Sequence, residues 1–301
     1  MRRYQGNRGV DPEMLGLGYG FLGVLGFSLT LPATRAAVTD LDPAIVGLGR
    51  AVVAALLAVI VLWATHQPLP NRKHWGSLLI VAAGVILGFP LLSAWAMQQL
   101  PAAHGAVVLG LMPLATAIAA TFRAGERPSL SFWIASIAGS TTVILFAVIS
   151  GAGQIQGADV ALLGAGVAAA VAYAEGGRLA RFLGGWQVIC WALVLAAPLL
   201  ILLVAIALWQ HGLVASPTAW LGFGYVSIVS QFLAFFAWYQ GLAMGGVARV
   251  GQIQLLQPFL TIFASALLLG EAIAPITIGA AAVVVTTVAL GKKAAIQRRL
   301  L

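Results

Sequence analysis

Polar side chains that could bind a small molecule interrupt an apolar stretch around residue 230. Ser227, Gln231 and Trp238 lie at i, i+4 and i+11, which places them on one face of a helix, with Tyr225 beside them. Burying an unpaired amide in hydrocarbon costs roughly 2–7 kcal/mol, so the amide of Gln231 must face a cavity or a neighbouring helix. A polar cavity and an interhelical hydrogen bond are equal alternatives at this point.

A second group of amides, Gln252, Gln254 and Gln257, directly precedes Pro258. Three amides within one and a half helical turns cannot all face lipid. Proline removes a backbone hydrogen bond and frees a carbonyl group one turn earlier, and Pro113 interrupts an earlier apolar run in the same way. The two prolines predict hinges or half-helix ends that face a substrate, although membrane helices also tolerate proline without any role.

Aromatic residues supply a possible stacking surface for a ligand. Trp95 and Trp238 are predicted to form a wall or gate on either side of a cavity, and Tyr173 and Tyr225 would add rings with hydroxyl groups. The alternative for the tryptophans is the aromatic belt at the membrane surface. A site of this composition suits an amino acid or another small amphipathic metabolite.

Charged residues inside the apolar runs are few, and the sequence favours structural roles for them. Arg50 is expected to snorkel to the outer surface or to pair with Asp42, and Glu175 is expected to pair with Arg178 at i+3. Glu126 should accept hydrogen bonds from free amides where the next helix begins. Since no acidic residue lies clearly at mid-membrane, the sequence favours facilitated diffusion or exchange over ion coupling.

The composition determines the environment in which these residues must be positioned. Of 301 residues, 61% are hydrophobic and 8% are charged, against about 45–50% and 25% in soluble domains. Such a chain cannot cover a water-facing surface, which excludes a cytosolic enzyme, a secreted disulfide scaffold and a disordered protein. The net charge of +8 comes from bases that flank apolar runs, so we expect a lipid bilayer as partner and no nucleic acid.

No catalytic or metal-binding set is found in the sequence. The single cysteine, Cys190, lies in an apolar run without a CxxC or Cys/His pattern, so neither a disulfide nor a metal is expected. No nucleophile–base pair or phosphate-binding loop is found either. We therefore expect no cofactor and no enzymatic activity.

The apolar runs predict an all-α polytopic membrane protein, because a spanning helix needs about 20 mostly apolar residues. The ten predicted transmembrane helices cover residues 14–33, 44–65, 75–99, 104–122, 131–149, 160–180, 186–210, 219–243, 247–269 and 275–290. If both termini are cytoplasmic, all 16 lysines and arginines except Arg35 and Arg50 lie on the cytoplasmic side.

An internal repeat divides the chain into two halves. Several short patterns recur 145 residues later: Pro113 and Pro258, Gly125-Glu126 and Gly270-Glu271, and Thr141-Thr142 and Thr286-Thr287. Ala94-Trp95 recurs as Ala237-Trp238, at an offset of 143. The predicted repeats, residues 14–150 and 158–292, hold five helices each, so the second is inverted in the membrane. Inverted repeats are a transporter architecture with the substrate site at their interface.

These residues resemble the drug/metabolite transporter superfamily, and the segment 237–271 is most similar to the EamA-type repeat. Within the superfamily the chain looks most like the YddG-type aromatic amino acid exporters. The resemblance covers residues 14–292 and implies a multi-pass protein of a bacterial inner membrane. It implies export of small metabolites, amino acids including aromatic ones, by alternating access around a central cavity. The alternative is an exporter of the same fold for a drug-like cation, a nucleoside or a sugar-type metabolite; the oligomeric state is left open, and a monomer is compatible with the sequence.

Overall fold

The computed structural model describes residues 11–100, 110–149, 157–269, 275–294 and 296–298. Each of the ten predicted spans is mostly helical over its described residues, with turns at residues 28–29 and 110–111. The beginning of the fourth predicted span, residues 104–109, lies outside the described residues, as does Glu271.

The first half of the chain consists of helices with one short strand. Its elements are α1 (Pro12–Phe27), α2 (Thr30–Ala37), α3 (Pro43–Ala64), η1 (Arg72–His74), α4 (Trp75–Val81), η2 (Ala82–Gly88), α5 (Phe89–Gln99), α7 (Met112–Arg123), β1 (Glu126–Pro128) and α8 (Leu130–Ile149). The second half repeats this order of long and broken helices. Its elements are α9 (Gly157–Leu183), α10 (Gly185–His211), α11 (Pro217–Gly224), η3 (Tyr225–Leu233), α12 (Ala234–Gly245), α13 (Val247–Gly251), η4 (Gln252–Leu256), α14 (Gln257–Leu269), α15 (Pro275–Lys293) and β2 (Ile296–Arg298).

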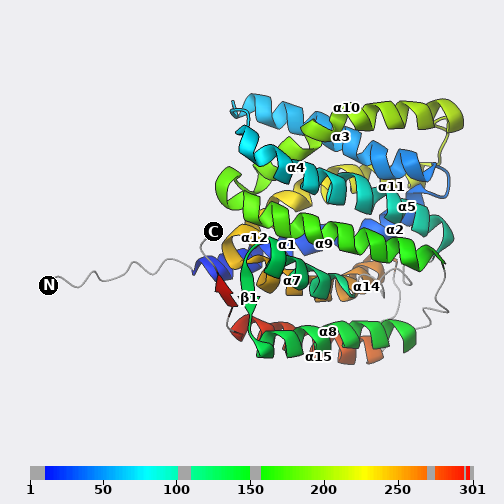
Figure 1. Ribbon diagram of the computed structural model, residues 1–301. Helices are drawn as coiled ribbons and strands as arrows, with labels where there is room; N and C mark the ends of the chain where they lie inside the picture. The colour runs from blue at the N-terminus through cyan, green and yellow to red at the C-terminus, as the bar shows by residue number, and fades with distance from the viewer. Residues whose placement is uncertain (1–10, 101–109, 150–156, 270–274, 295, 299–301) are drawn as a thin grey trace.

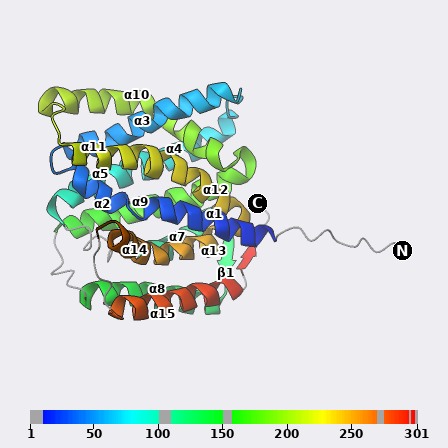
Figure 2. The ribbon, with the colours of Figure 1, turned by 180° about the vertical axis from the view of Figure 1, so that it is seen from behind.

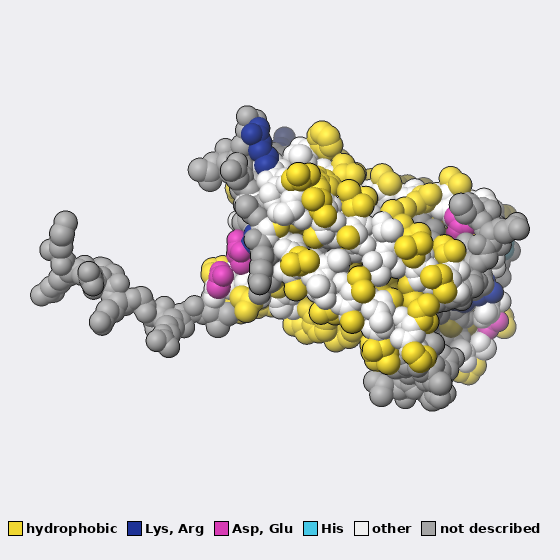
Figure 3. All heavy atoms as spheres, turned by 90° about the horizontal axis from the view of Figure 1, so that it is seen from below, with side chains coloured by type: hydrophobic (Ala, Val, Ile, Leu, Met, Phe, Trp, Pro, Cys, Tyr) yellow, Lys and Arg dark blue, Asp and Glu magenta, His cyan; other side chains and the backbone are white. Residues whose placement is uncertain are grey.

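Six helical segments among the described residues are long and apolar enough to cross a membrane, and two shorter apolar helices accompany them. The six segments are Pro12–Ala37, Pro43–Ala64, Arg72–Gln99, Gly157–Leu183, Gly185–His211 and Pro217–Gly245. On the face that carries α8 and α15, hydrophobic side chains occupy the middle and the visible charges lie near the two ends (Figure 3). The protein is therefore a multi-pass membrane protein, whereas the count of ten spans stays a prediction.

The helices lie side by side in layers (Figures 1 and 2). α3 and α10 pack together at one edge, α8 and α15 at the opposite edge, and α1, α9 and α12 lie between them. The prediction of a purely helical chain missed β1 and β2, which pair antiparallel with Glu126 opposite Arg298. Three-residue strands carry almost no sequence signal, because what stabilises them is their pairing with a distant segment.

Two helices are interrupted at equivalent positions of the two halves. η2 and η3 are π-helical, and they begin 143 residues apart, at Ala82 and Tyr225, which is the offset of the Ala-Trp pairs. Both follow directly on an α-helix and continue into another. π-helical turns are rare and frequently lie at functional sites.

The two repeated prolines begin helices instead of kinking them. Pro113 is in the first turn of α7, and Pro258 is the second residue of α14, which follows the 3₁₀ segment η4. Proline is favoured at a helix start, where its missing N–H has no intrahelical partner to lose. The predicted hinge at Pro258 therefore lies at the junction of η4 and α14, and the one at Pro113 follows the turn residues 110–111.

Small residues let α1 approach α12 closely. A Cβ atom added at Gly16 would lie 2.3 Å from the main-chain nitrogen of Gly245, and one added at Gly241 would lie 2.6 Å from the nitrogen of Gly20. Contacts this short require glycine on both helices. They fix the first helix of one half against the eighth predicted span of the other half.

Candidate functional site

A small cavity lined by both halves of the chain lies in the interior. The first half lines it with Phe27, Thr30, Leu31, Arg50, Val85, Phe89 and Met112, and the second half with Tyr173, Ser230, Gln231, Phe235 and Gln257. The space open to the centres of water molecules is about 20 Å³. One water needs about 10–15 Å³ by that measure, so the cavity holds one or two waters and must widen to take a metabolite.

Gln231 both lines this cavity and joins the two halves. It is buried in η3, and its Nε2 donates to the main-chain oxygen of Val85 in η2 at 3.0 Å. Beside it, the hydroxyl groups of Thr30 and Ser230 are hydrogen-bonded at 2.8 Å. Gln231 thus lines a cavity and also forms an interhelical hydrogen bond, so it combines the two alternatives drawn from the sequence.

Gln257 brings a second amide to the cavity from the first residue of α14. Its Nε2 donates to the main-chain oxygen of Phe27 at 3.2 Å. The main-chain oxygen of Gln257 accepts from the hydroxyl of Thr261 at 3.0 Å. Within the described part of the chain, the side-chain oxygens of Gln231 and Gln257 accept no hydrogen bond. Both oxygens can therefore accept one from a ligand.

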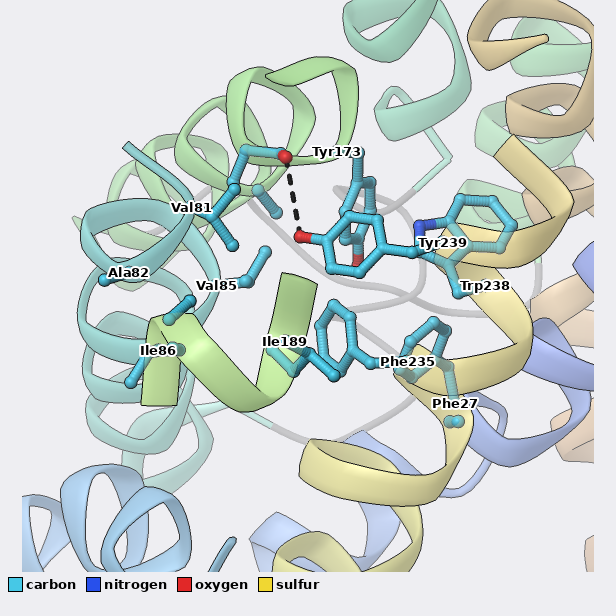
Figure 4. Packing of buried hydrophobic residues seen from close by; sticks show 14 of the residues in the cluster. Phe27, Val81, Ala82, Val85, Ile86, Tyr173, Ile189, Phe235, Trp238 and Tyr239 are labelled. Atoms are coloured by element: carbon cyan, nitrogen blue, oxygen red, sulfur yellow. Dashed lines mark hydrogen bonds between the residues drawn. The ribbon is translucent and has the colours of Figure 1, made fainter. Parts of the chain in front are cut away.

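Aromatic rings form one wall of the cavity (Figure 4). The ring of Tyr173 lies 6.2 Å from that of Phe235 and 5.3 Å from that of Trp238, and Phe27 lies 5.0 Å from Phe235. Trp238 itself is fully buried behind this wall and does not line the cavity. The ring of Tyr239 lies next to that of Phe235, and its hydroxyl donates to the main-chain oxygen of Ala172 at 3.5 Å.

The tryptophan pair predicted from the repeat is not symmetric in the structure. Trp238 is covered by α1, whereas the side chain of Trp95 is 43% exposed on α5 and does not line the cavity. The expectation for Trp95 therefore needs correction. Equivalent positions in two repeats have different neighbours, and only the close approach of α1 decides which ring is buried.

Four other predicted residues are not among those that line the cavity. The Tyr225 hydroxyl donates to the oxygen of Gly26 at 3.0 Å, and the Ser227 hydroxyl donates within its own helix. Gln252 donates to Ser136 of α8 at 3.0 Å, and Gln254 is buried nearby. The π-helical and 3₁₀ segments change the angle between successive side chains, so a face drawn for a regular helix is not preserved.

Arg50 is the cavity residue that the sequence analysis assigned incorrectly. It was expected to reach the outer surface or to pair with Asp42, but it is only 1% exposed and lines the cavity. Asp42 instead accepts from the main-chain nitrogen of Ala44 at 2.8 Å and faces His211 at 3.6 Å. Arg50 lies near one end of an apolar run, and the sequence there does not reveal that the side chain faces the interior of the bundle.

Ionic contacts close the end of the bundle where α1 begins. The two carboxylate oxygens of Glu126 accept from the main-chain nitrogens of Val247 and Ala248 at 2.9 and 2.8 Å, and Arg181 lies 3.4 Å away. Glu126 thus caps α13 of the other half, and not the helix that follows it as expected. The sequence hint is Gly246, whose φ of 92° ends α12 and exposes these two amides.

A second ionic cluster lies at the same end. Glu175 pairs with Arg178, as predicted, and also with Arg123 of α7 at 3.1 Å. A third pair joins Arg249 to Glu13. Together with Glu126 these contacts tie α1, α7, α9 and α13 to one another.

An apolar helical bundle with a cavity lined by both of its halves is the architecture of a membrane transporter. The chain matches the EamA-like transporter family twice, over residues 14–148 and 156–290, and it belongs to that family. It is 46% identical over 252 residues to the uncharacterized transporter YdeK of Bacillus subtilis (strain 168), covering 84% of this chain and 88% of that protein. A solved crystal structure shares the fold with a TM-score of 0.75 at 18% identity, covering 92% of this chain and 98% of the other.

Proposed function

We propose that this transporter exports small metabolites, most of all amino acids including aromatic ones, by alternating access around the central cavity. The observation that carries the proposal is the composition of the cavity. Rings of Phe27, Tyr173 and Phe235 lie beside the amides of Gln231 and Gln257. An amino acid presents the matching chemistry, an apolar or aromatic side chain next to strongly polar groups.

The proposed topology has ten spans, both termini in the cytoplasm and the two halves inverted. The distribution of charge supports it. Arg123, Arg178, Arg181 and Arg249 lie in the ionic contacts at the end where α1 begins, whereas Arg35 binds the main-chain oxygens of Met97 and Gln98. An excess of bases on one side is typical of the cytoplasmic face, and we place the protein in a bacterial inner membrane.

In the proposed cycle this narrow cavity, which is too small for a metabolite, belongs to a substrate-free state. The ionic contacts of Glu126 and Glu175 would open to admit substrate from the cytoplasm and reform before release. The helix starts at Pro113 and Pro258 would serve as the points of bending. Since no carboxylate is among the described residues that line the cavity, facilitated diffusion or exchange is the proposed energetics.

The charge of the cavity separates the amino-acid proposal from one alternative. A drug-like cation would need a carboxylate or an uncharged aromatic cage, and the one charged side chain among the described lining residues is Arg50. A nucleoside or sugar-type metabolite is the remaining alternative, because amides and hydroxyl groups bind either.

Uptake into liposomes that contain the purified protein tests the proposal. We expect saturable uptake of labelled tryptophan and phenylalanine without an imposed ion or pH gradient, and none in protein-free liposomes. Threonine, a nucleoside, a sugar and a quaternary ammonium compound are compared in parallel. Uptake of the nucleoside, sugar or ammonium compound alone would contradict the substrate class, and uptake only under a pH gradient would contradict the proposed energetics.

A further inference from the structure

Arg50 is a buried cation without a counter-ion in the described part of the chain. Its side chain leaves the first half of α3 and is 1% exposed, and its Nε has no hydrogen-bond partner. No described residue forms an ion pair or a hydrogen bond with the rest of its guanidinium group. Tyr173 lies close enough for an electrostatic interaction, but its hydroxyl group is not an anion.

The carboxylates of Asp42, Glu126 and Glu175 are engaged elsewhere. Asp42, the acidic residue nearest in sequence, caps α3 through the nitrogen of Ala44 and faces His211. Glu126 and Glu175 belong to the ionic contacts at the end where α1 begins.

An unpaired guanidinium in the membrane interior needs an explanation. Arginine stays protonated under all ordinary conditions, so it cannot escape the cost of burial by losing its charge. Buried charges in proteins are paired with an opposite charge, because removing an ion from water without compensation is strongly unfavourable. Ionisable residues within membrane spans accordingly mark substrate or ion pathways.

The surroundings of Arg50 are those of a ligand site. It shares the cavity with the amide oxygens of Gln231 and Gln257, which accept no hydrogen bond from a described residue, and with the hydroxyl groups of Thr30 and Ser230. The cavity therefore combines one positive charge, two free acceptors and an aromatic wall. A molecule that complements it has a carboxylate, a hydrogen-bond donor such as an ammonium group, and an apolar side chain.

We propose that Arg50 binds the carboxylate of the transported molecule and that the transporter requires a carboxylate in its substrates. This inference rests on the proposed function, since it assigns the charged contact of the same cavity. The planar guanidinium of arginine binds a carboxylate through two parallel hydrogen bonds, which fixes the orientation of the ligand as well as its charge. An ammonium group is accepted by Gln231 and Gln257 but is not required.

Binding to the purified protein tests the inference. The probes are tryptophan, indole-3-propionate, which has the carboxylate without the ammonium group, and tryptamine, which has the ammonium group without the carboxylate. Thermal stabilisation and titration calorimetry should show binding of the first two and at least tenfold weaker binding of tryptamine. In Arg50→Gln the affinity for tryptophan and indole-3-propionate should fall at least tenfold, and Arg50→Lys should recover part of it.

Arg35→Gln is the matched control, since Arg35 contacts the main-chain oxygens of Met97 and Gln98 and does not line the cavity. It should leave all three affinities unchanged. Because Arg50→Gln removes an uncompensated buried charge, we expect the variant to fold and to unfold at a temperature no lower than that of the unaltered protein. Equal binding of tryptamine and tryptophan, or unchanged affinities in Arg50→Gln, would overturn the inference.

A wider panel separates this inference from the proposed function. It adds aliphatic carboxylates, 2-oxo acids and the amide of each compound. Arg50-dependent binding of other carboxylates, without binding of any amino acid, would refute the proposed substrate and support the role of Arg50. Tryptophan transport that persists in Arg50→Gln would support the proposed substrate and refute the role of Arg50. Failure of every carboxylate to bind would also refute the role of Arg50.

Discussion

The side-chain amide of Gln231 donates a hydrogen bond of 3.0 Å to the main-chain oxygen of Val85, so the two π-helical segments touch beside the cavity. One segment belongs to each half of the chain, and they occupy equivalent positions in the repeat. A contact between two irregular segments can be broken without unfolding a regular helix. We therefore expect the cavity to open where these segments meet.

Replacement of Gln231 by leucine should reduce transport at least tenfold while the protein stays folded. The substitution removes the bond to Val85 and one free acceptor of the cavity, and loss of one such hydrogen bond costs only about 1 kcal/mol of stability. Initial uptake rates and thermal unfolding of the same preparation measure both effects. Gln99→Leu, at an exposed position at the end of α5, is the control. Normal uptake by Gln231→Leu would remove Gln231 from the site.

Trp238 should affect substrate affinity through the ring of Tyr173, 5.3 Å away. Trp238→Phe keeps most of the buried volume, so we expect a severalfold higher KM for aromatic substrates with little change in maximal rate. Truncation to alanine should instead cost about 3–5 kcal/mol of stability, because it leaves a large void in the core. Trp95→Phe is the matched control, and an equal effect at Trp95 would argue against a special role for the buried ring.

Glu126 should hold the end of the bundle at α13 closed. Glu126→Gln keeps the size of the side chain but removes the negative charge from hydrogen bonds to Val247 and Ala248, and bonds to a charged group contribute about 1.5–3 kcal/mol each. A cysteine at the buried position Thr116, in a chain whose Cys190 is replaced by alanine, reports opening through its rate of alkylation.

We expect that cysteine to react severalfold faster in Glu126→Gln than in the reference chain. Glu13→Gln serves for comparison, since the carboxylate of Glu13 is half-exposed and its pair with Arg249 should contribute little. An unchanged rate in Glu126→Gln, or the same increase in Glu13→Gln, would show that the capping contact does not control access.

Gly16 should be intolerant of any side chain. A leucine there meets the backbone of Gly245 at 2.3 Å from its Cβ, which neither helix can relieve by a side-chain rotation. We expect destabilisation of at least about 1–3 kcal/mol and poor recovery of monodisperse protein. Gly18→Leu, two residues away and facing open space, should behave like the unaltered protein in size-exclusion chromatography and thermal unfolding. If both variants behaved alike, the close approach of α1 and α12 would not be needed for folding.

Much of the fold could be predicted from local sequence. Long apolar runs must be helices in a membrane, because a lipid environment offers no hydrogen bonds to the backbone. Helices cover most of the described residues of the ten predicted segments, and the Glu175–Arg178 pair follows from i+3 spacing alone. Tyr173, Gln231 and Gln257, which were predicted from their polar groups within apolar runs, line the cavity of the structure, and their contact with a substrate stays a prediction.

The remaining features depend on which segment packs against which. Composition and period reveal that a residue lies on a polar face, but not what covers that face. Arg50 is turned into the cavity, Trp95 is left at the surface and Glu126 caps a helix more than a hundred residues away, all through contacts between distant segments. The π-helical turns at η2 and η3 also shift the faces after them. The sequence by itself therefore determined the environment, the helices and the repeat, whereas the tertiary structure decided the site, because burial and pairing are properties of neighbours in space.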